Sequence, residues 1–485
     1  MRTLTESPAP SSRTGLPVWV RVADAATLLL VVLAAIVAEG GGFRTHLLGV
    51  RLAVTSPLRT LVLALVVAAV RHALVPRQPI YRAIPGQFGA WRREPSVRAA
   101  AAALIATRPT ILAVGLLAVA TFGYAGGEPP YRVSSNELAN LPVRWDAGWY
   151  LGIATHGYRY TPNQPRRQQN IVFFPAYPTL VRGVGRLFGR SPGAFVWGGM
   201  GVSLLAFFGA LVYLYAFARD RLPDDEARYA LWAVAAYPFA LFYFAVYTES
   251  LYLLAAVAIF YHFERREYWR AAAWGLLAGL TRPNGCFISV ALAVLAVSPW
   301  LPQWLAGGAP GPGGSRDRRL TMTAILFAAA PGVGVLIYTF FIWRITGNPL
   351  AWAAGHEAWG RTYNGLTVLV TERYDWIANL GVSGYMSRLP VDFLNATGVA
   401  FALAAVWPVA RRLGLAYAVF ILVNMLPPLA EGGLLSAGRF SSVMFPAFVW
   451  FASAVPARHR VGWVATFAAF QALNAALFFT WRPLF

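Results

Sequence analysis

The stretch of sequence that decides the fold is residues 194–218, AFVWGGMGVSLLAFFGALVYLYAFA, which contains no charged residue. A helix needs roughly 20 apolar residues to cross the hydrocarbon core of a bilayer, and this run is long enough. Comparable apolar runs recur along nearly the whole chain, at residues 25–38, 58–70, 109–122, 229–246, 320–343, 398–410, 413–426, 440–455 and 461–480. The pattern predicts an all-α polytopic membrane protein.

The composition of the 485-residue chain agrees, because 58% of it is hydrophobic and only 13% is charged. The net charge of +21 is carried by arginine, which pairs readily with phosphate and suits anionic lipids. No soluble basic domain is visible that would bind nucleic acid, so no nucleic-acid partner is expected. The single cysteine, Cys286, excludes an intramolecular disulfide, and the scattered histidines lack the spacing of a zinc site. Neither a metal nor a cofactor is expected.

Arginine-rich turns set the predicted topology, because arginine concentrates in short cytoplasmic loops. The basic segments placed in the cytoplasm are the loop from Arg71 to Arg108 and the turns at 219–228, 264–270, 301–319, 411–412 and 456–460. The intervening segments, predicted to lie outside, are 127–190, 247–250, 281–285, 344–396 and 431–439. Parity then gives about thirteen spans and a cytoplasmic N-terminus. Residues 268–300 form either a hairpin or one kinked helix, and the charge distribution favours the hairpin.

The chain is expected to have five parts. They are a disordered cytoplasmic arm at 1–21, a two-span extension with a basic cytoplasmic loop at 22–108, a membrane module with the outer loop 127–190 at 109–300, a Gly/Pro-rich cytoplasmic linker at 301–319, and a C-terminal membrane bundle with the outer loop 344–396 at 320–485. The first apolar stretch is interpreted as a retained anchor, with a cleaved signal peptide as the alternative.

The string RWDAGWY at residues 144–150 carries the clearest chemical signal, because it sets a carboxylate among aromatic residues. Partial exclusion of water around Asp146 can tune a carboxylate towards work as a general base. The alternative is that Asp146 pairs with Arg144 while the aromatic residues form an interfacial belt. The residues alone leave both readings open.

Two longer strings, RWDAGWYLGIATHGY at 144–158 and NIVFFPAYPTLVR at 170–182, resemble the signature of the PIG-V-like mannosyltransferases, membrane enzymes of the GT-C class. The resemblance covers roughly residues 109–455. It continues in order through YTESLY at 247–252, LTRPNG at 280–285, GNPL at 347–350, WGR at 359–361, GRF at 438–440 and FP at 445–446.

The resemblance implies a GT-C fold and inverting transfer of mannose from a polyprenyl-phosphate-mannose donor, with Asp146 as the catalytic base. Arg144, Arg282 and Arg439 are the candidates to bind the donor phosphate and stabilise it as leaving group. For Arg282 and Arg439 the alternative is snorkelling to lipid headgroups. The candidates for substrate binding are Trp145, Trp149, Tyr150, Asn170, Tyr177, Glu249 and His356. An unpaired carboxylate between apolar spans would be costly, so Glu249 is expected to pair with an arginine or to bind the sugar.

The expected partners are a polyprenyl-phosphate sugar donor, a lipid or glycan acceptor and membrane lipids. Every string lies on the predicted outer side, where nucleotide sugars are not expected and a lipid-phosphate donor is. The richness in alanine, arginine, glycine and tryptophan favours a bacterial plasma membrane. Two alternatives stay open: a GT-C transferase for another sugar, and a flippase or transporter of a lipid-linked saccharide.

Overall fold

The computed structural model describes residues 17–40, 43–47, 50–54, 56–75, 89, 91–164, 167–189, 191–300 and 317–484. It forms two compact units, one made of Met1–Glu94 with Arg186–Gly189 and the other of Pro95–Gly185 with Arg190–Phe485. Most of the predicted arm at 1–21 and of the predicted linker at 301–319 lies outside the described residues.

The first unit contains helices α1 (Val18–Gly40) and α2 (Pro57–Leu74), which pack against each other. Arg71 of α2 pairs with Asp24 of α1, with 2.7 Å between Nε and Oδ1, and both side chains are buried. Strands β1 (Phe43–Leu47) and β2 (Val50–Val54) form an antiparallel hairpin between the helices. The all-α class predicted from the sequence is confirmed for the described residues apart from this hairpin, whose second strand has valine or leucine at every other position, as is typical of strands.

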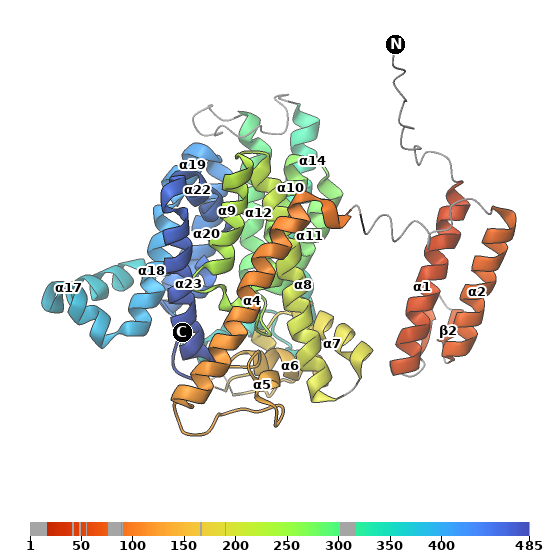
Figure 1. Cartoon of the computed structure of the whole chain (residues 1–485), viewed down its shortest axis with the longest axis horizontal. Coiled ribbons are helices and arrows are strands. Elements are labelled where there is room, and N and C mark those ends of the chain that lie inside the picture. The colour runs from red at the N-terminus through yellow and green to blue at the C-terminus, as the bar shows by residue number, and fades with distance from the viewer. Residues whose placement is uncertain are drawn as a thin grey trace, which may run out of the picture. The chain divides into compact units, whose positions relative to one another are not determined.

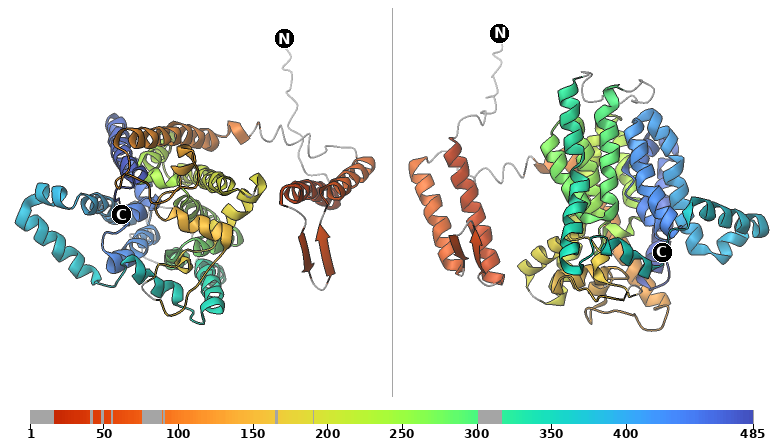
Figure 2. Two further views of the ribbon diagram at one scale, coloured as in Figure 1. Left: turned by 90° about the horizontal axis from the view of Figure 1, so that it is seen from below. Right: turned by 180° about the vertical axis from the view of Figure 1, so that it is seen from behind.

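The second unit is a helical bundle (Figures 1 and 2). Its elements are α4 (Pro95–Phe122), α5 (Glu137–Asn140), α6 (Ala147–His156), η1 (Asn170–Val172), α7 (Ala176–Phe188), α8 (Pro192–Arg219), α9 (Asp224–Ala236), η2 (Ala240–Tyr243), α10 (Glu249–Glu264), α11 (Tyr268–Thr281), η3 (Pro283–Phe287), α12 (Ile288–Val297), η4 (Ser298–Trp300), α14 (Arg318–Ala328), α15 (Ala330–Thr346), α16 (Ala351–Ala354), η5 (Gly355–Trp359), α17 (Gly365–Arg388), α18 (Pro390–Ala404), α19 (Val406–Arg412), α20 (Leu415–Gly432), α21 (Ala437–Ser441), α22 (Phe445–Ala454) and α23 (Ala457–Phe479).

The helices confirm a polytopic membrane protein. In the described part of the chain, seven helical stretches are long and apolar enough to cross a membrane: Pro57–Leu74, Pro95–Phe122, Pro192–Arg219, Pro283–Trp300, Arg318–Thr346, Pro390–Arg412 and Ala457–Phe479. The other predicted spans fall on α1 and on the shorter α9, α10, α11, α20 and α22. Among the described residues, every predicted span therefore overlaps a helix, although some spans are not helical throughout.

The bundle has two distinct ends. Figure 1 shows α5 and α6 together at one end, where α4 and α23 finish, whereas α19 lies at the opposite end. The last residues of α19 are Arg411 and Arg412, so a predicted cytoplasmic turn and the predicted outer loop 127–190 are separated by the length of the bundle. One difference concerns the loop from Arg71 to Arg108, because α4 already begins at Pro95. Its run of alanines favours helix more strongly than the interspersed arginines suggest.

Two interruptions bring polar backbone to the core of the bundle. The predicted span 229–246 is broken after α9, because Pro238 disfavours helical geometry at Tyr237, which has φ −51° and ψ 141°. The chain then runs as buried non-helical backbone and η2 up to α10. The second interruption is the turn at Arg282–Phe287 between α11 and α12. Tyr268 and Ala296 line one small cavity, so the two ends of this segment lie together and the segment is a hairpin.

Helix α17 lies inside the segment 344–396, for which only a polar outer loop is predicted. Figure 1 shows it projecting sideways from the bundle beside α18. Gly381 interrupts its helical geometry with φ 69°, and most of its side chains are exposed. Arg373 of α17 pairs with Asp392 of α18 at 2.7 Å, which ties the two helices together.

Candidate active site

A cavity of about 610 Å³ opens at the α6 end of the bundle. It is lined by Trp145, Asp146, Trp149, Tyr150, Gln168, Val172, Phe173, Phe174, Thr281, Arg282, Pro283, Asn284, His356, Ala358, Trp359, Arg361, Pro428, Glu431, Leu435, Ser436, Arg439 and Phe440. These residues come from segments more than 290 positions apart in the sequence, as the pair Asp146 and Arg439 illustrates. The size suits a ligand of the dimensions of a small molecule or a sugar with its phosphate.

Asp146 is held in the cavity through its backbone. It precedes helix α6, and the residue before it, Trp145, has a left-handed φ of 55° that is uncommon for a bulky residue. The buried hydroxyl of Tyr247 accepts the Asp146 N–H at 3.1 Å and donates to the Arg144 carbonyl at 3.0 Å. Strained backbone of this kind persists where surrounding contacts over-determine it, which is common at functional sites.

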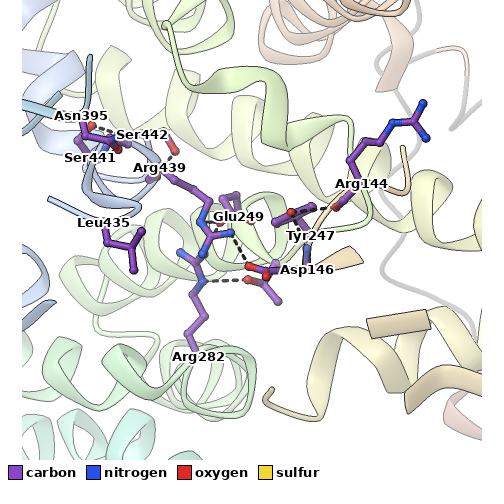
Figure 3. Close-up of polar contacts among 12 residues, drawn as sticks. Arg144, Asp146, Tyr247, Glu249, Arg282, Asn395, Leu435, Arg439, Ser441 and Ser442 are labelled. Atoms are coloured by element: carbon purple, nitrogen blue, oxygen red, sulfur yellow. Dashed lines mark hydrogen bonds and ion pairs between the residues drawn. The ribbon is translucent and has the colours of Figure 1, made fainter. Parts of the chain in front are cut away.

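Glu249 and Arg282 form a buried pair beneath the cavity (Figure 3). Glu249 is the first residue of α10, where the helix dipole favours a negative charge, and its side chain is fully buried. Arg282 follows the last residue of α11, and its Nε donates to the Thr248 hydroxyl at 2.8 Å. The expectation that Glu249 pairs with an arginine is confirmed.

Arg439 joins Asp146 to Glu249. Its Nη1 donates to Asp146 Oδ2 at 3.1 Å, and its Nε lies 3.2 Å from Glu249 Oε1. The short helix α21 that carries Arg439 packs closely on the ring of Phe239, because a Cβ at Gly438 would stand only 2.1 Å from that ring. Only glycine therefore allows α21 to lie at this depth.

The four charged groups form one network of two carboxylates and two guanidiniums. Burial alone lowers the pKa of Arg439, but the Glu249 and Asp146 carboxylates raise it by more, so the guanidinium stays charged. Within the described residues, Nη1 of Arg282 and Oε2 of Glu249 are buried without a hydrogen-bond partner. A buried cationic N–H without an acceptor is costly, so the site is suited to receive a negatively charged group.

Arg144 lies outside the cavity, although the sequence places it among the phosphate-binding candidates. Its side chain is fully buried and turned away from Asp146 (Figure 3). It donates to the carbonyls of Phe479 at 3.0 Å and Asn140 at 2.9 Å, and it pairs with Glu137. The alternative Arg144–Asp146 pair is therefore wrong, because these partners occupy the guanidinium and Asp146 pairs with Arg439 instead.

Asn170 and Tyr177 also lie away from the cavity. The side chain of Asn170 accepts the Arg159 N–H at 3.0 Å and donates to the Gly157 carbonyl at 3.0 Å, which closes the loop before η1. The hydroxyl of Tyr177 is buried against the Gly199 carbonyl at 3.0 Å. Both residues shape the backbone around the cavity and do not line it.

Four further candidates, Trp145, Trp149, Tyr150 and His356, do line the cavity. Aromatic rings dominate one of its walls. The ring centre of Trp149 lies 5.8 Å from that of Phe173 and 5.6 Å from that of Trp359. Burial raises the pKa of Tyr150 to about 12, with Glu249 adding to the shift, so its phenol is protonated at neutral pH. Burial lowers the pKa of His356 to about 4, with Arg361 adding to the shift, so its imidazole is neutral.

Sequence reasoning missed four residues that shape the site. Tyr247 and Thr248 fix Asp146 and Arg282, and they directly precede Glu249 within the string YTESLY. Trp359 and Arg361 line the cavity from the string WGR. Both strings belong to the family resemblance found in the sequence. Their spacing, however, does not indicate which of their residues contact one another in the folded chain.

A comparison with curated protein sequences found no match. Residues 131–297 match the family model of the Mannosyltransferase (PIG-V) family. The match includes Asp146, Glu249 and Arg282, so three of the four charged residues lie within it. This membrane-embedded protein is thus similar, over residues 131–297, to the PIG-V mannosyltransferases, and the resemblance expected from its sequence strings is confirmed there.

Proposed function

We propose that the protein is an inverting mannosyltransferase that moves mannose from a polyprenyl-phosphate-mannose donor to a hydroxyl of a lipid or glycan acceptor. The observation that carries the proposal is the pairing of Asp146 with Arg439 in a cavity that Arg282 also lines. One group able to take a proton and two able to hold a phosphate lie together there, as this reaction requires.

In the proposed reaction, the acceptor oxygen attacks the anomeric carbon while its proton passes to Asp146. The bond between the anomeric carbon and the phosphate oxygen breaks, and its electron pair leaves with the polyprenyl phosphate. Negative charge therefore grows on the phosphate, where the buried and unpaired Nη1 of Arg282 is an available donor. Charge-assisted hydrogen bonds of this kind stabilise a leaving group strongly in a site that excludes water.

The two walls of the cavity divide the substrate between them. The aromatic wall of Trp149, Phe173 and Trp359 suits the apolar face of a sugar ring. Charge is instead supplied to the cavity by Arg439 of α21 and by Arg282, which precedes η3. Asp146 lies between these walls with 23% of its side chain exposed, so an acceptor hydroxyl can reach it. Glu249 neutralises the arginines beneath and is too buried to touch a substrate directly.

The proposal places the site on the outer face of a bacterial plasma membrane, with the N-terminus in the cytoplasm. Support comes from the two ends of the bundle, because the cavity opens at the end opposite to Arg411 and Arg412. Arginine-rich turns face the cytoplasm, which leaves the cavity on the other side. A lipid-linked donor fits that side, because it diffuses in the bilayer.

The test is mannose transfer by the purified protein in proteoliposomes, with radiolabelled polyprenyl-phosphate mannose or GDP-mannose offered separately alongside an acceptor lipid extract. We expect label to move to the acceptor from the lipid donor alone. Transfer from GDP-mannose alone would overturn the proposal that the donor is linked to a lipid. Translocation of the lipid-linked sugar between leaflets without any transfer would favour the flippase instead.

A further inference from the structure

A third arginine of the cavity, Arg361, differs from Arg282 and Arg439 in its surroundings. It lies directly after Gly360, whose left-handed φ of 72° turns the chain out of η5. The loop that carries it is anchored to α20, because the Asn364 N–H donates to the Ala430 carbonyl at 3.0 Å. The loop therefore holds the half-buried Arg361 at the cavity wall without a helix around it.

The ion pairs of the cavity distinguish the three arginines. Arg282 pairs with Glu249, and Arg439 pairs with both Glu249 and Asp146. No ion pair joins Arg361 to a carboxylate in the described part of the chain, and its guanidinium donates a long hydrogen bond of 3.4 Å to the Leu435 carbonyl. Arg361 is thus the cavity arginine whose charge no carboxylate offsets at close range.

All three guanidiniums nevertheless lie near one aromatic ring. Their central carbons lie 5.5 Å (Arg282), 5.4 Å (Arg361) and 5.6 Å (Arg439) from the centre of the Phe440 ring. Burial lowers the pKa of Arg361 to about 10; the positive charge of Arg439 adds to this shift, and the Asp146 and Glu431 carboxylates oppose it. Like charges held this close in a poorly solvated site favour the entry of an anion.

We propose that Arg361 is the main phosphate ligand of this cavity and that, with Nη1 of Arg282, it binds the phosphate of a polyprenyl-phosphate sugar and of the polyprenyl phosphate left after transfer. The inference rests on the proposed function, which it deepens by naming the group that senses the charge of the leaving phosphate. The donor phosphodiester carries one negative charge, and rupture of its bond to the sugar adds a second. Arg361 can respond to that added charge because, in the described part of the chain, it forms no close ion pair with a carboxylate, unlike Arg282 and Arg439.

The test compares Arg361→Gln and Arg361→Lys with Arg388→Gln, a matched control in which an exposed arginine of α17 outside the cavity loses its charge. The probes are undecaprenyl phosphate and uncharged undecaprenol, with binding measured by thermophoresis of the detergent-purified protein. We expect Arg361→Gln to weaken undecaprenyl phosphate binding at least about tenfold. Arg361→Lys should lie between this variant and wild type, and binding of undecaprenol should be unchanged in all variants.

Two results would overturn the inference: wild-type affinity of Arg361→Gln for undecaprenyl phosphate, or an equal loss of affinity for undecaprenol. The outcome is separable from that of the proposed function. If the wild type transfers mannose but Arg361→Gln keeps full phosphate affinity, the inference fails and the function stands. If the wild type transfers no mannose but phosphate binding depends on Arg361, the anion site stands and the transferase proposal fails.

Discussion

The substitution Tyr247→Phe tests whether the position of Asp146 matters for the chemistry. It removes one hydroxyl that receives the Asp146 N–H at 3.1 Å and donates to the Arg144 carbonyl at 3.0 Å, while the buried ring stays in place. Two backbone groups then lose a partner, which costs about 1–3 kcal/mol of stability. Displacement of a catalytic group by even 1 Å can cost about a hundredfold in rate, so we expect kcat to fall about tenfold to a hundredfold.

The assay is steady-state transfer of mannose from polyprenyl-phosphate mannose, together with binding of undecaprenyl phosphate. Donor binding should change little, because the contact of Tyr247 with the phosphate-binding candidates is limited to Arg439. The Arg439 guanidinium carbon lies 5.4 Å from the centre of the Tyr247 ring. Tyr215→Phe is the control, since this buried tyrosine donates its hydroxyl to Asp224 within the basic turn 219–228. Equal kcat in Tyr247→Phe and in this control would refute the positioning role.

Three further predictions concern buried or half-buried charged groups. Glu249→Ala leaves Arg282 and Arg439 without their shared carboxylate, so we expect a loss of about 3–5 kcal/mol in stability, seen as a lower thermal midpoint in detergent; an unchanged midpoint would contradict the buried network. Arg144→Met should lower the thermal midpoint and leave undecaprenyl phosphate affinity unchanged, and the reverse pattern would restore Arg144 to the phosphate site. His356 has a folded pKa near 4, below its unfolded value, so its neutral form supports stability above pH 6.5 and this support is lost as the pH falls towards 4. Compared with wild type, His356→Gln should therefore become relatively more stable as the pH drops from 6.5, and a constant difference in thermal midpoint would contradict the shift.

The helical membrane fold was predictable because its signal is local. Apolar runs of sufficient length specify spans whatever their neighbours are. The structure adds what local patterns do not contain. In the sequence, the segment that Pro238 breaks after α9 looks like one continuous apolar span. The residues of α17 look like a polar loop, because the large apolar residues among them follow no periodic pattern.

The sequence indicated which residues belong to the candidate site better than it indicated which of those residues pair with each other. Asp146, Arg282 and Arg439 were expected from their strings, and the structure brings all three to one cavity. The sequence could not show that Arg144 lies outside the site. An arginine two positions from a carboxylate gives the same sequence pattern whether it is buried in the structure or binds a ligand. Its partner carbonyl belongs to Phe479, 335 positions away, and only the folded chain makes that contact.

The charged network under the cavity also bears on the choice between enzyme and transporter. Buried ion pairs contribute little net stability and lose several kcal/mol when one partner is removed, so a protein retains them where they serve a purpose. Here they hold Asp146 in place and leave Arg361 and one nitrogen of Arg282 available. Fixed geometry of this kind suits catalysis, which depends on groups that are positioned before the substrate arrives.

The most direct test of the central claim is single-turnover mannose transfer with the donor already bound, in wild type, Asp146→Asn and the control Asp375→Asn, which changes an exposed carboxylate of α17. Asp146→Asn keeps the size of the side chain and removes its ability to take a proton. We expect wild-type donor affinity, a wild-type rate in Asp375→Asn, and a rate in Asp146→Asn at least about a hundredfold lower. Transfer by Asp146→Asn at the wild-type rate would contradict the claim that Asp146 is the base.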